Sequence, residues 1–452
     1  MRLANGLAAW LCVWVLGAGL PTQAAVVSSG MTGGTHLEQG CGADLDEELC
    51  SLGSSERRHL FEDIFEYSYR VRVGPGVYDF ITLHRVVRES SPGVPLRTPR
   101  SVFLVHGDVW GFRGAFLGSM ASEAVPRQQS FALFLARRGV DVWGIDLRWV
   151  NVPQATTDFA FMKEWNLGLH ARDVGLGMKL ARATRASGGS GNGRMVLLGW
   201  SRGATVSYAW LNAETQLPAE QRQVSGFIPV DMAYKLAPED AALRQAACQS
   251  HATLSQYQAA GLYEGGAVGL TLQGAGALAL YQADMSSSLL PGFTNRQAAL
   301  LFGSATFALQ SPAIIPAYHF VGGQFDARGV PTMLSWTRER FFFDTLLQAS
   351  PYQSLGEQVD TTAMWCGSVD VPHDDHLSAV SVPVLYVGGT GGTGRYGLHS
   401  LSLLGSQDVS SLVVRRFSHE ARVMDYGHAD LFLADDAEAS VWLPIQRWLE
   451  RH

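Results

Sequence analysis

Short apolar segments that alternate with amphipathic helical segments constrain the fold of this chain more than any other feature. The predicted strands are Ser101–Val105, Val140–Leu147, Arg194–Gly199, Val224–Val230 and Val382–Val387. Segments with helical spacing lie between them, at Gln129–Arg138, Glu164–Arg185 and Arg202–Glu214. Strands buried on both faces are typical of parallel sheets, so the alternation predicts an α/β fold with a mainly parallel sheet covered by helices on both sides.

The two ends of the predicted sheet and one long interval complete this organisation. Alternating residues at Phe61–Val73 and Tyr78–Arg88 predict an antiparallel pair of strands, and Ser411–Phe417 predicts the last strand. About 150 residues separate Asp231 from Val382, which is too long for a crossover between strands. We therefore expect a core at 59–231 and 382–452, interrupted by a helical, aromatic cap at 232–381.

The N-terminal 25 residues have the layout of a secretory signal peptide. A short apolar run at Leu7–Leu16 is followed by Gly17, Gly19, Pro21 and small residues. A membrane anchor is the alternative, but the run is shorter than the roughly 20 residues that a span needs. We expect a secreted or periplasmic protein whose mature chain has no transmembrane segment and begins with a loosely packed stretch at 26–58.

The mature chain would retain an even number of cysteines. They are Cys41, Cys50, Cys248 and Cys366. In an exported protein such a set favours disulfides, and Cys41–Cys50 with Cys248–Cys366 is the simplest of three connectivities. Buried free thiols are the alternative. No C-x-x-C spacing occurs, so zinc is not expected.

Charge and composition exclude some classes of partner. Lys and Arg number 34 against 41 Asp and Glu, which gives a net charge of −7, and no basic run occurs. We therefore do not expect the protein to bind nucleic acid through attraction of basic side chains to the phosphate backbone. An acidic cluster with histidines at 370–376 resembles a metal site, but a solvated loop is the simpler interpretation. We expect neither a metal nor a cofactor.

The sequence Gly199-Trp200-Ser201-Arg202-Gly203 follows a predicted buried strand and opens a predicted helix. This is G-x-S-x-G in the context that supports catalysis, because a serine on a tight strand-to-helix turn projects its hydroxyl above the sheet. The helix N-terminus also favours negative charge nearby. Ser201 is the candidate nucleophile.

A serine nucleophile needs a general base and a carboxylate that orients it. His428 lies between the last strand and the last helix, at the sheet edge where Ser201 is expected, and His419 is its competitor. The loop 388–394, a common place for the carboxylate, contains only Gly and Thr. Asp231, at the end of the strand after the nucleophile helix, is the candidate acid. The fallbacks are Asp408 and Asp425.

Two backbone N–H groups are predicted to stabilise an oxyanion. They belong to Arg202, which follows the nucleophile, and to Asp108, in the turn after His106-Gly107. A carboxylate at position 108 would oppose the oxyanion, so we expect Arg202 or Arg113 to neutralise it. His106 itself is expected to be structural.

These motifs resemble the α/β-hydrolase superfamily from about residue 60 to the C-terminus. The segments Asp141-Val142-Trp143 and Gly427–Phe432 (GHADLF) are similar to the acid lipase and esterase group. That group has Asp where this chain has Gly389-Thr390. In its G-x-S-x-G turn, the residues on either side of the serine are usually His and Gln, where this chain has Trp200 and Arg202. The resemblance implies a mainly parallel eight-stranded sheet with a cap after the sixth strand.

The resemblance also implies the chemistry of a serine carboxylester hydrolase that acts through an acyl-enzyme. The apolar cap favours an acyl chain or aromatic ester, as a small molecule or a lipid, with contact at a lipid interface left open. Acyl transfer or peptide cleavage by the same residues is an alternative. A binding protein on a decayed hydrolase fold is the alternative of a different class.

Overall fold

The computed structural model describes residues 52–310 and 313–452. The predicted signal peptide at 1–25, the stretch at 26–51 and the predicted Cys41–Cys50 pair lie outside the described residues. None of the helices in the described ranges is long and apolar enough to cross a bilayer.

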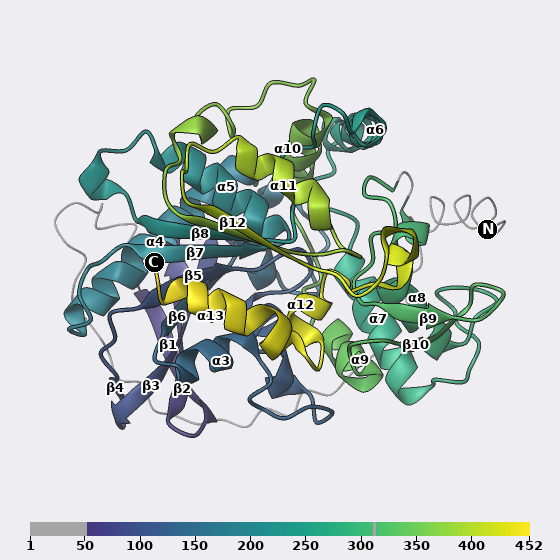
Figure 1. The fold of residues 1–452 in the computed structure, drawn as a ribbon, viewed down its shortest axis with the longest axis horizontal. Helices are drawn as coiled ribbons and strands as arrows, with labels where there is room; N and C mark the ends of the chain where they lie inside the picture. The colour runs from purple at the N-terminus through teal and green to yellow at the C-terminus, as the bar shows by residue number, and fades with distance from the viewer. Residues whose placement is uncertain (1–51, 311–312) are drawn as a thin grey trace.

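A single large sheet forms the centre of the molecule (Figure 1). It contains ten strands in the order β1-β2-β3-β6-β5-β7-β8-β11-β12, with β4 paired to β3. The strands are β1 (Leu52–Phe61), β2 (Ile64–Arg72), β3 (Phe80–Ser91), β4 (Val94–Pro95), β5 (Ser101–Val105), β6 (Asp141–Asp146), β7 (Met195–Trp200), β8 (Val224–Val230), β11 (Val384–Gly389) and β12 (Val409–Val414). From β6 to β12 all pairs are parallel, and β1 to β3 add antiparallel strands at one edge.

The predicted α/β fold is confirmed, but the sheet has ten strands rather than eight. The additional strands are β1 and the two-residue β4. Strand β1 occupies 52–61, so the last residues of the stretch expected to be loosely packed belong to the sheet. The sequence of β1 is polar and does not show the apolar alternation by which strands are predicted. Its charged residues are paired instead: Arg57 with Glu89 on β3, and Arg58 with Glu66 on β2. Cross-strand charge pairs of this kind stabilise a strand without apolar alternation.

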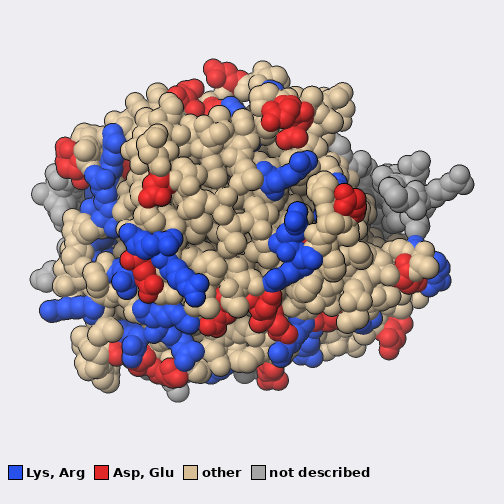
Figure 2. Space-filling model, in the orientation of Figure 1, with Lys and Arg blue, Asp and Glu red and all other residues tan. Residues whose placement is uncertain are grey.

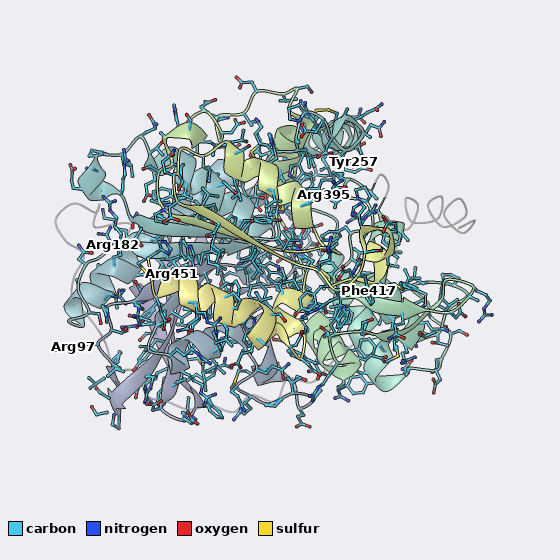
Figure 3. All side chains as sticks on the ribbon, in the orientation of Figure 1. Arg97, Arg182, Tyr257, Arg395, Phe417 and Arg451 are labelled. Carbon is cyan, nitrogen blue, oxygen red and sulfur yellow. A yellow bond between two sulfur atoms is a disulfide. The ribbon has the colours of Figure 1, made fainter. Side chains whose placement is uncertain are left out.

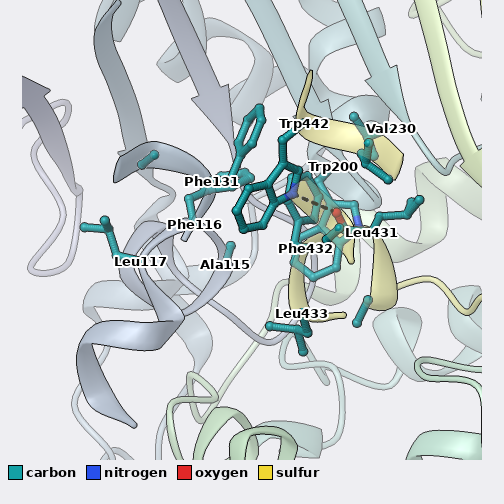
Figure 4. Packing of buried hydrophobic residues seen from close by; sticks show 14 of the residues in the cluster. Ala115, Phe116, Leu117, Phe131, Trp200, Val230, Leu431, Phe432, Leu433 and Trp442 are labelled. Atoms are coloured by element: carbon teal, nitrogen blue, oxygen red, sulfur yellow. Dashed lines mark hydrogen bonds between the residues drawn. The ribbon is translucent and has the colours of Figure 1, made fainter. Parts of the chain in front are cut away.

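Helices cover both faces of the sheet. They include α2 (Phe112–Phe116), α3 (Phe131–Arg137), α4 (Leu167–Ser187), α5 (Arg202–Glu214), α11 (Leu398–Ser402), α12 (Asp430–Leu433) and α13 (Leu443–Leu449). Successive side chains of a strand point to opposite faces. Val102 and Leu104 of β5 therefore join the core under α3 and α13, whereas Phe103 and Val105 join the core under α4 and α5. Figure 4 shows the first core, in which the indole N–H of Trp442 donates to the carbonyl of Leu431.

The described residues between β8 and β11 contain five α-helices, two short 3₁₀ helices and a short hairpin. The α-helices and the strands of the hairpin are α6 (Ala241–Ala259), α7 (Val268–Tyr281), α8 (Asn295–Ser304), β9 (Gly323–Phe325), β10 (Pro331–Leu334), α9 (Glu339–Leu347) and α10 (Leu355–Cys366). The hairpin was not expected from the sequence. Excluding β1 and β4, β8 is the sixth strand along the chain, so the insertion follows the predicted strand.

A disulfide joins two helices of this insertion. Cys248 on α6 is bonded to Cys366 at the end of α10, at a sequence separation of 118. The predicted pairing of these two cysteines is therefore confirmed. The bond links the first and last helices of the insertion.

Glycines of α7 allow close helix packing. A Cβ atom added at Gly269 would lie 1.7 Å from the carbonyl oxygen of Ser350, and one at Gly276 would lie 2.8 Å from that of Phe343. Helix α7 contacts α9 along this side. Gly269 and Gly276 thus allow α7 to pack closely against α9 and the residues that follow it.

Candidate active site

Ser201 occupies a tight turn between β7 and α5. Its backbone has φ 56° and ψ −131°, a strained conformation for a residue with a side chain. The flanking glycines have no room for a Cβ atom. At Gly199 it would lie 2.4 Å from the carbonyl oxygen of Gly203, and at Gly203 it would lie 2.2 Å from that of Val105. The G-x-S-x-G spacing is therefore a packing requirement at this turn.

Three strands converge beside Ser201. Its backbone N–H donates to the carbonyl of Val230 at the end of β8, at 2.9 Å. Gly107, just after β5, lies against its side chain, because a Cβ atom there would be 3.2 Å from Ser201 Oγ. The hydroxyl therefore lies at the carboxyl edge of the sheet, where open α/β sheets place their ligand sites.

Asp231 and His428 meet at the same edge. The Nδ1 atom of His428 is 2.6 Å from Oδ2 of Asp231, and both side chains are buried. Asp231 has φ 49° and its N–H donates to the carbonyl of Val387 on β11, at 2.7 Å. A carboxylate at this atom of the ring selects the tautomer whose other nitrogen, Nε2, can accept a proton.

The glycine-rich loop after β11 surrounds the carboxylate of Asp231. Oδ1 accepts hydrogen bonds from the N–H groups of Gly389 and Gly394, both at 2.9 Å, and Oδ2 accepts one from Thr393 at 3.0 Å. A Cβ atom at Gly392 would lie 1.9 Å from Oδ2. The loop that lacks a carboxylate of its own therefore binds the carboxylate supplied by β8.

Aromatic side chains enclose the imidazole of His428. Trp200 stacks on it with ring centroids 5.2 Å apart, and Tyr318 and Phe320 from the insertion lie at 5.3 and 5.9 Å. The backbone N–H of His428 also donates to the carbonyl of His319, at 3.0 Å. Burial raises the pKa of Tyr318 well above its usual value. The insertion and the sheet edge thus meet at His428.

Asp430 was missed by the sequence analysis, although it stands in the motif Gly427–Phe432. It is buried, and its Oδ2 accepts from the N–H groups of Gly427 and Gly322, both at 2.7 Å. The hydroxyl of Thr337 donates to Oδ1 at 2.6 Å. Burial raises the pKa of Asp430 to about 7. This side chain connects the turn that carries His428 to the insertion.

The competing residues do not contact His428. His419 is exposed and bonded to Arg422. Asp408 lies 3.0 Å from the ring of His452. Asp425 is buried, but its carboxylate accepts backbone N–H groups, those of Arg416, Phe417 and Tyr426.

The charges predicted near the oxyanion position are paired. Nε of Arg202 donates to Oδ1 of Asp108 at 2.6 Å, whereas Arg113 binds Glu66 instead. Burial alone would lower the pKa of Arg202, but the charges of Asp108 and Glu357 outweigh it and raise that pKa. Within the described chain, the backbone N–H groups of Arg202 and Asp108 have no protein acceptor.

His106 and the acidic cluster have local roles. The ring of His106 contacts the carbonyl of Gly107 at 2.8 Å and accepts the N–H of Leu147 at 3.1 Å, and burial lowers its pKa. In the cluster at 370–376, Asp374 pairs with Lys235. Among the described residues, no three His, Cys, Asp or Glu side chains are grouped as a metal site requires.

Comparisons with known proteins support the fold. No protein-family model and no curated protein matches the chain. A candidate lipase from Sulfolobus solfataricus aligns with 90% of this chain and 98% of its own, with 16% identity and a TM-score of 0.58. A soluble variant of monoglyceride lipase from Saccharomyces cerevisiae aligns with 89% of this chain and 96% of its own, with 12% identity and a TM-score of 0.43.

The first of these similarities concerns the arrangement of elements rather than the sequence. The chain therefore has the fold of the α/β-hydrolase superfamily, as its motifs predicted.

Proposed function

We propose that this protein is a serine hydrolase that cleaves carboxylic esters. Ser201 is the nucleophile, His428 the general base, and Asp231 the carboxylate that orients the base. The observation that carries the proposal is the 2.6 Å contact of His428 with Asp231 at the sheet edge that also holds the strained turn of Ser201. Neither of the two carboxylates considered as alternatives reaches His428.

The reaction follows from these positions. Ser201 Oγ attacks the ester carbonyl carbon while His428 Nε2 takes its proton, and Asp231 stabilises the imidazolium. The unbonded N–H groups of Arg202 and Asp108 stabilise the oxyanion. The intermediate collapses as His428 protonates the departing alcohol. Water, activated by the same histidine, then hydrolyses the acyl-enzyme and releases the acid.

The surroundings of His428 favour an apolar substrate. The rings of Trp200, Tyr318 and Phe320 line the region beside the base. An acyl chain or an aromatic ester gains free energy by burial among such rings. The paired charges of Asp108 and Arg202 leave no isolated charge at the oxyanion position. The name of the similar structure with the TM-score of 0.58, a candidate lipase, agrees with ester substrates.

Export is part of this proposal. The apolar run and small residues at 1–25 and the Cys248–Cys366 disulfide support a protein that matures outside the cytosol. N-terminal sequencing of the protein recovered from culture medium or periplasm checks it. A chain that stays in the cytosol and retains residues 1–25 would contradict export.

The catalytic proposal is tested by covalent labelling. A fluorophosphonate probe should label the purified protein at Ser201, as peptide mapping would reveal, and Ser201→Ala should abolish the label. The same variant should lower kcat for p-nitrophenyl butyrate by about 10⁴-fold or more. Ser187→Ala, which changes an exposed serine at the end of α4, is the control. A folded wild-type protein that takes no label would favour the binding-protein alternative.

A further inference from the structure

A cavity lies beside the loop 388–394 that holds the carboxylate of Asp231. Its volume is about 230 Å³. Its lining includes three arginines, Arg395, Arg415 and Arg422, together with His419 and the hydroxyl residues Thr390 and Thr393. Three segments supply them: the loop after β11, the end of β12 and the short 3₁₀ helix His419–Met424. Figure 2 shows Lys and Arg side chains on this face, in the area where Figure 3 labels Arg395.

The arginines of this cavity form no ion pair among the described residues, although Asp240 and Glu420 interact at longer range with Arg395 and Arg422. No Asp or Glu is among its lining residues. In the part of the chain that the structure describes, no carboxylate lies within 4.0 Å of a guanidinium nitrogen of Arg395, Arg415 or Arg422. By contrast, the adjacent Arg416 pairs with Asp436. Like charges around one cavity repel each other, so a bound anion would relieve an existing cost.

The guanidinium group of Arg422 is positioned by contacts with His419 rather than by a carboxylate. Its Nη1 donates to the carbonyl oxygen of His419 at 3.1 Å and lies 3.1 Å from the ring nitrogen Nε2 of the same residue. Its Nε is buried and has no hydrogen-bond partner among the described residues. An oriented guanidinium with an unused buried donor is suited to bind an oxyanion.

We propose that this cavity binds a phosphate group. A tetrahedral dianion offers three or more acceptor oxygens to three guanidinium groups, whereas a single carboxylate offers two. The group is either free phosphate or part of a phosphate ester such as a lipid headgroup. This site does not depend on the proposed esterase activity.

The cavity shares its wall with the structure around Asp231. Thr393 lines the cavity, and its N–H donates to Asp231 Oδ2. Arg395 lines the cavity and follows Gly394, whose N–H donates to Oδ1. A bound phosphate would therefore restrain the loop that holds the carboxylate, and hydrogen exchange of the peptide containing 388–397 should slow.

Calorimetric titration of the full chain with sodium phosphate, against sodium chloride of equal ionic strength, tests the proposal. We expect saturable binding at one site, weakened about tenfold or more in Arg415→Gln and in Arg422→Gln, since each removes a charge-assisted hydrogen bond. Arg447→Gln, an exposed arginine on α13 outside the cavity, should bind as the wild type does. Circular dichroism checks that each variant is folded. If one of them unfolds, Arg395→Gln is tested in its place, because Arg395 also lines the cavity and its side chain is exposed.

Vesicles distinguish the two sources of the phosphate group. If the site takes a headgroup, the protein should sediment with phosphatidylcholine vesicles that contain phosphatidic acid, free phosphate should compete, and Arg415→Gln should release it. If the site takes free phosphate, calorimetry detects binding and sedimentation of wild type and Arg415→Gln is equal. The proposal is overturned if neither probe binds, or if Arg415→Gln and Arg422→Gln bind phosphate as tightly as the wild type.

Discussion

His428 Nδ1 lies 2.6 Å from Asp231 Oδ2, although the two residues are 197 positions apart in the sequence. The contact depends on the backbone of Asp231, which leaves β8 with φ 49°. From there the carboxylate reaches the N–H groups at the tip of β11, and His428 approaches it from the loop after β12. The two strands on either side of β11, β8 and β12, thus supply an acid and a base to one position at the tip of β11.

Replacement of the acid should separate its role from those of other carboxylates. Asp231→Asn keeps the shape of the side chain but presents an amide to His428, which favours the wrong tautomer of the imidazole. We expect kcat for p-nitrophenyl butyrate at neutral pH to fall on the order of 10³–10⁴-fold. Asp408→Asn, at an exposed side chain, is the control and should remain close to wild type. A near-normal Asp231→Asn enzyme would remove Asp231 from the mechanism.

The glycine loop around Asp231 predicts an effect at a residue that touches no substrate. In Gly392→Ala, the new Cβ atom would lie 1.9 Å from Asp231 Oδ2, so the carboxylate or the loop must move. We expect kcat to fall on the order of 10²-fold, the effect of a displacement of about 1 Å. Gly274→Ala is the control: a Cβ atom added at Gly274, on α7, has nothing within 4 Å, so this variant should retain activity. Equal activities of the two variants would show that the loop tolerates the change.

A buried ionic network should make stability depend on pH. His84 lies 2.8 Å from Glu66 and 3.0 Å from Asp146. Burial alone would lower the pKa of His84, but the two carboxylates outweigh it and raise the pKa to about 9. Burial would also raise the pKa of Glu66, but His84 and Arg113 hold it at about 2. The folded state thus stabilises the charged forms of both groups.

The signs of these shifts define the pH windows. The contribution of His84 is complete below its unfolded pKa of 6.5 and is lost as pH rises toward 9, whereas that of Glu66 is lost as pH falls from 4.5 toward 2. Between pH 6.5 and 9, urea denaturation should report a fall in the free energy of unfolding on the order of 1–3 kcal/mol. His84→Gln should flatten this slope, and exposed His59→Gln should leave it. Parallel slopes for all three proteins would contradict the assignment.

The disulfide of the insertion should contribute to stability under oxidising conditions. Removing Cys248–Cys366 in the variant Cys248→Ser/Cys366→Ser releases a closed loop with a sequence separation of 118. The free energy of unfolding should fall by about 2–5 kcal/mol, with a lower Tm in scanning calorimetry. A reducing agent should lower the Tm of the wild type and leave the variant unchanged. No response of the wild type to reduction would mean that the bond does not stabilise the fold.

The strands and helices around Ser201 were predictable because local patterns specify them. The apolar runs at Ser101–Val105 and Val224–Val230 became β5 and β8 with the same bounds. The turn at Ser201 was predictable because the G-x-S-x-G pattern is local in sequence, and Gly199 is required by contacts with Gly203 and Ala204 within that turn. The need for Gly203 comes instead from the distant Val105 and His106. In contrast, β1 was missed because its charged residues are paired across the sheet with Glu66 and Glu89, and a local pattern does not reveal such pairs.

The sequence by itself determined the fold class, the serine turn and the candidates for the remaining roles. It left three carboxylates and two histidines open, because their side chains come from segments far apart in the chain. Only the tertiary structure brought Asp231 and His428 together, and it explained the absence of a carboxylate at 388–394 by the hydrogen bonds this loop donates to Asp231. Contacts between strand ends depend on the register and twist of the whole sheet, which no single segment of sequence encodes.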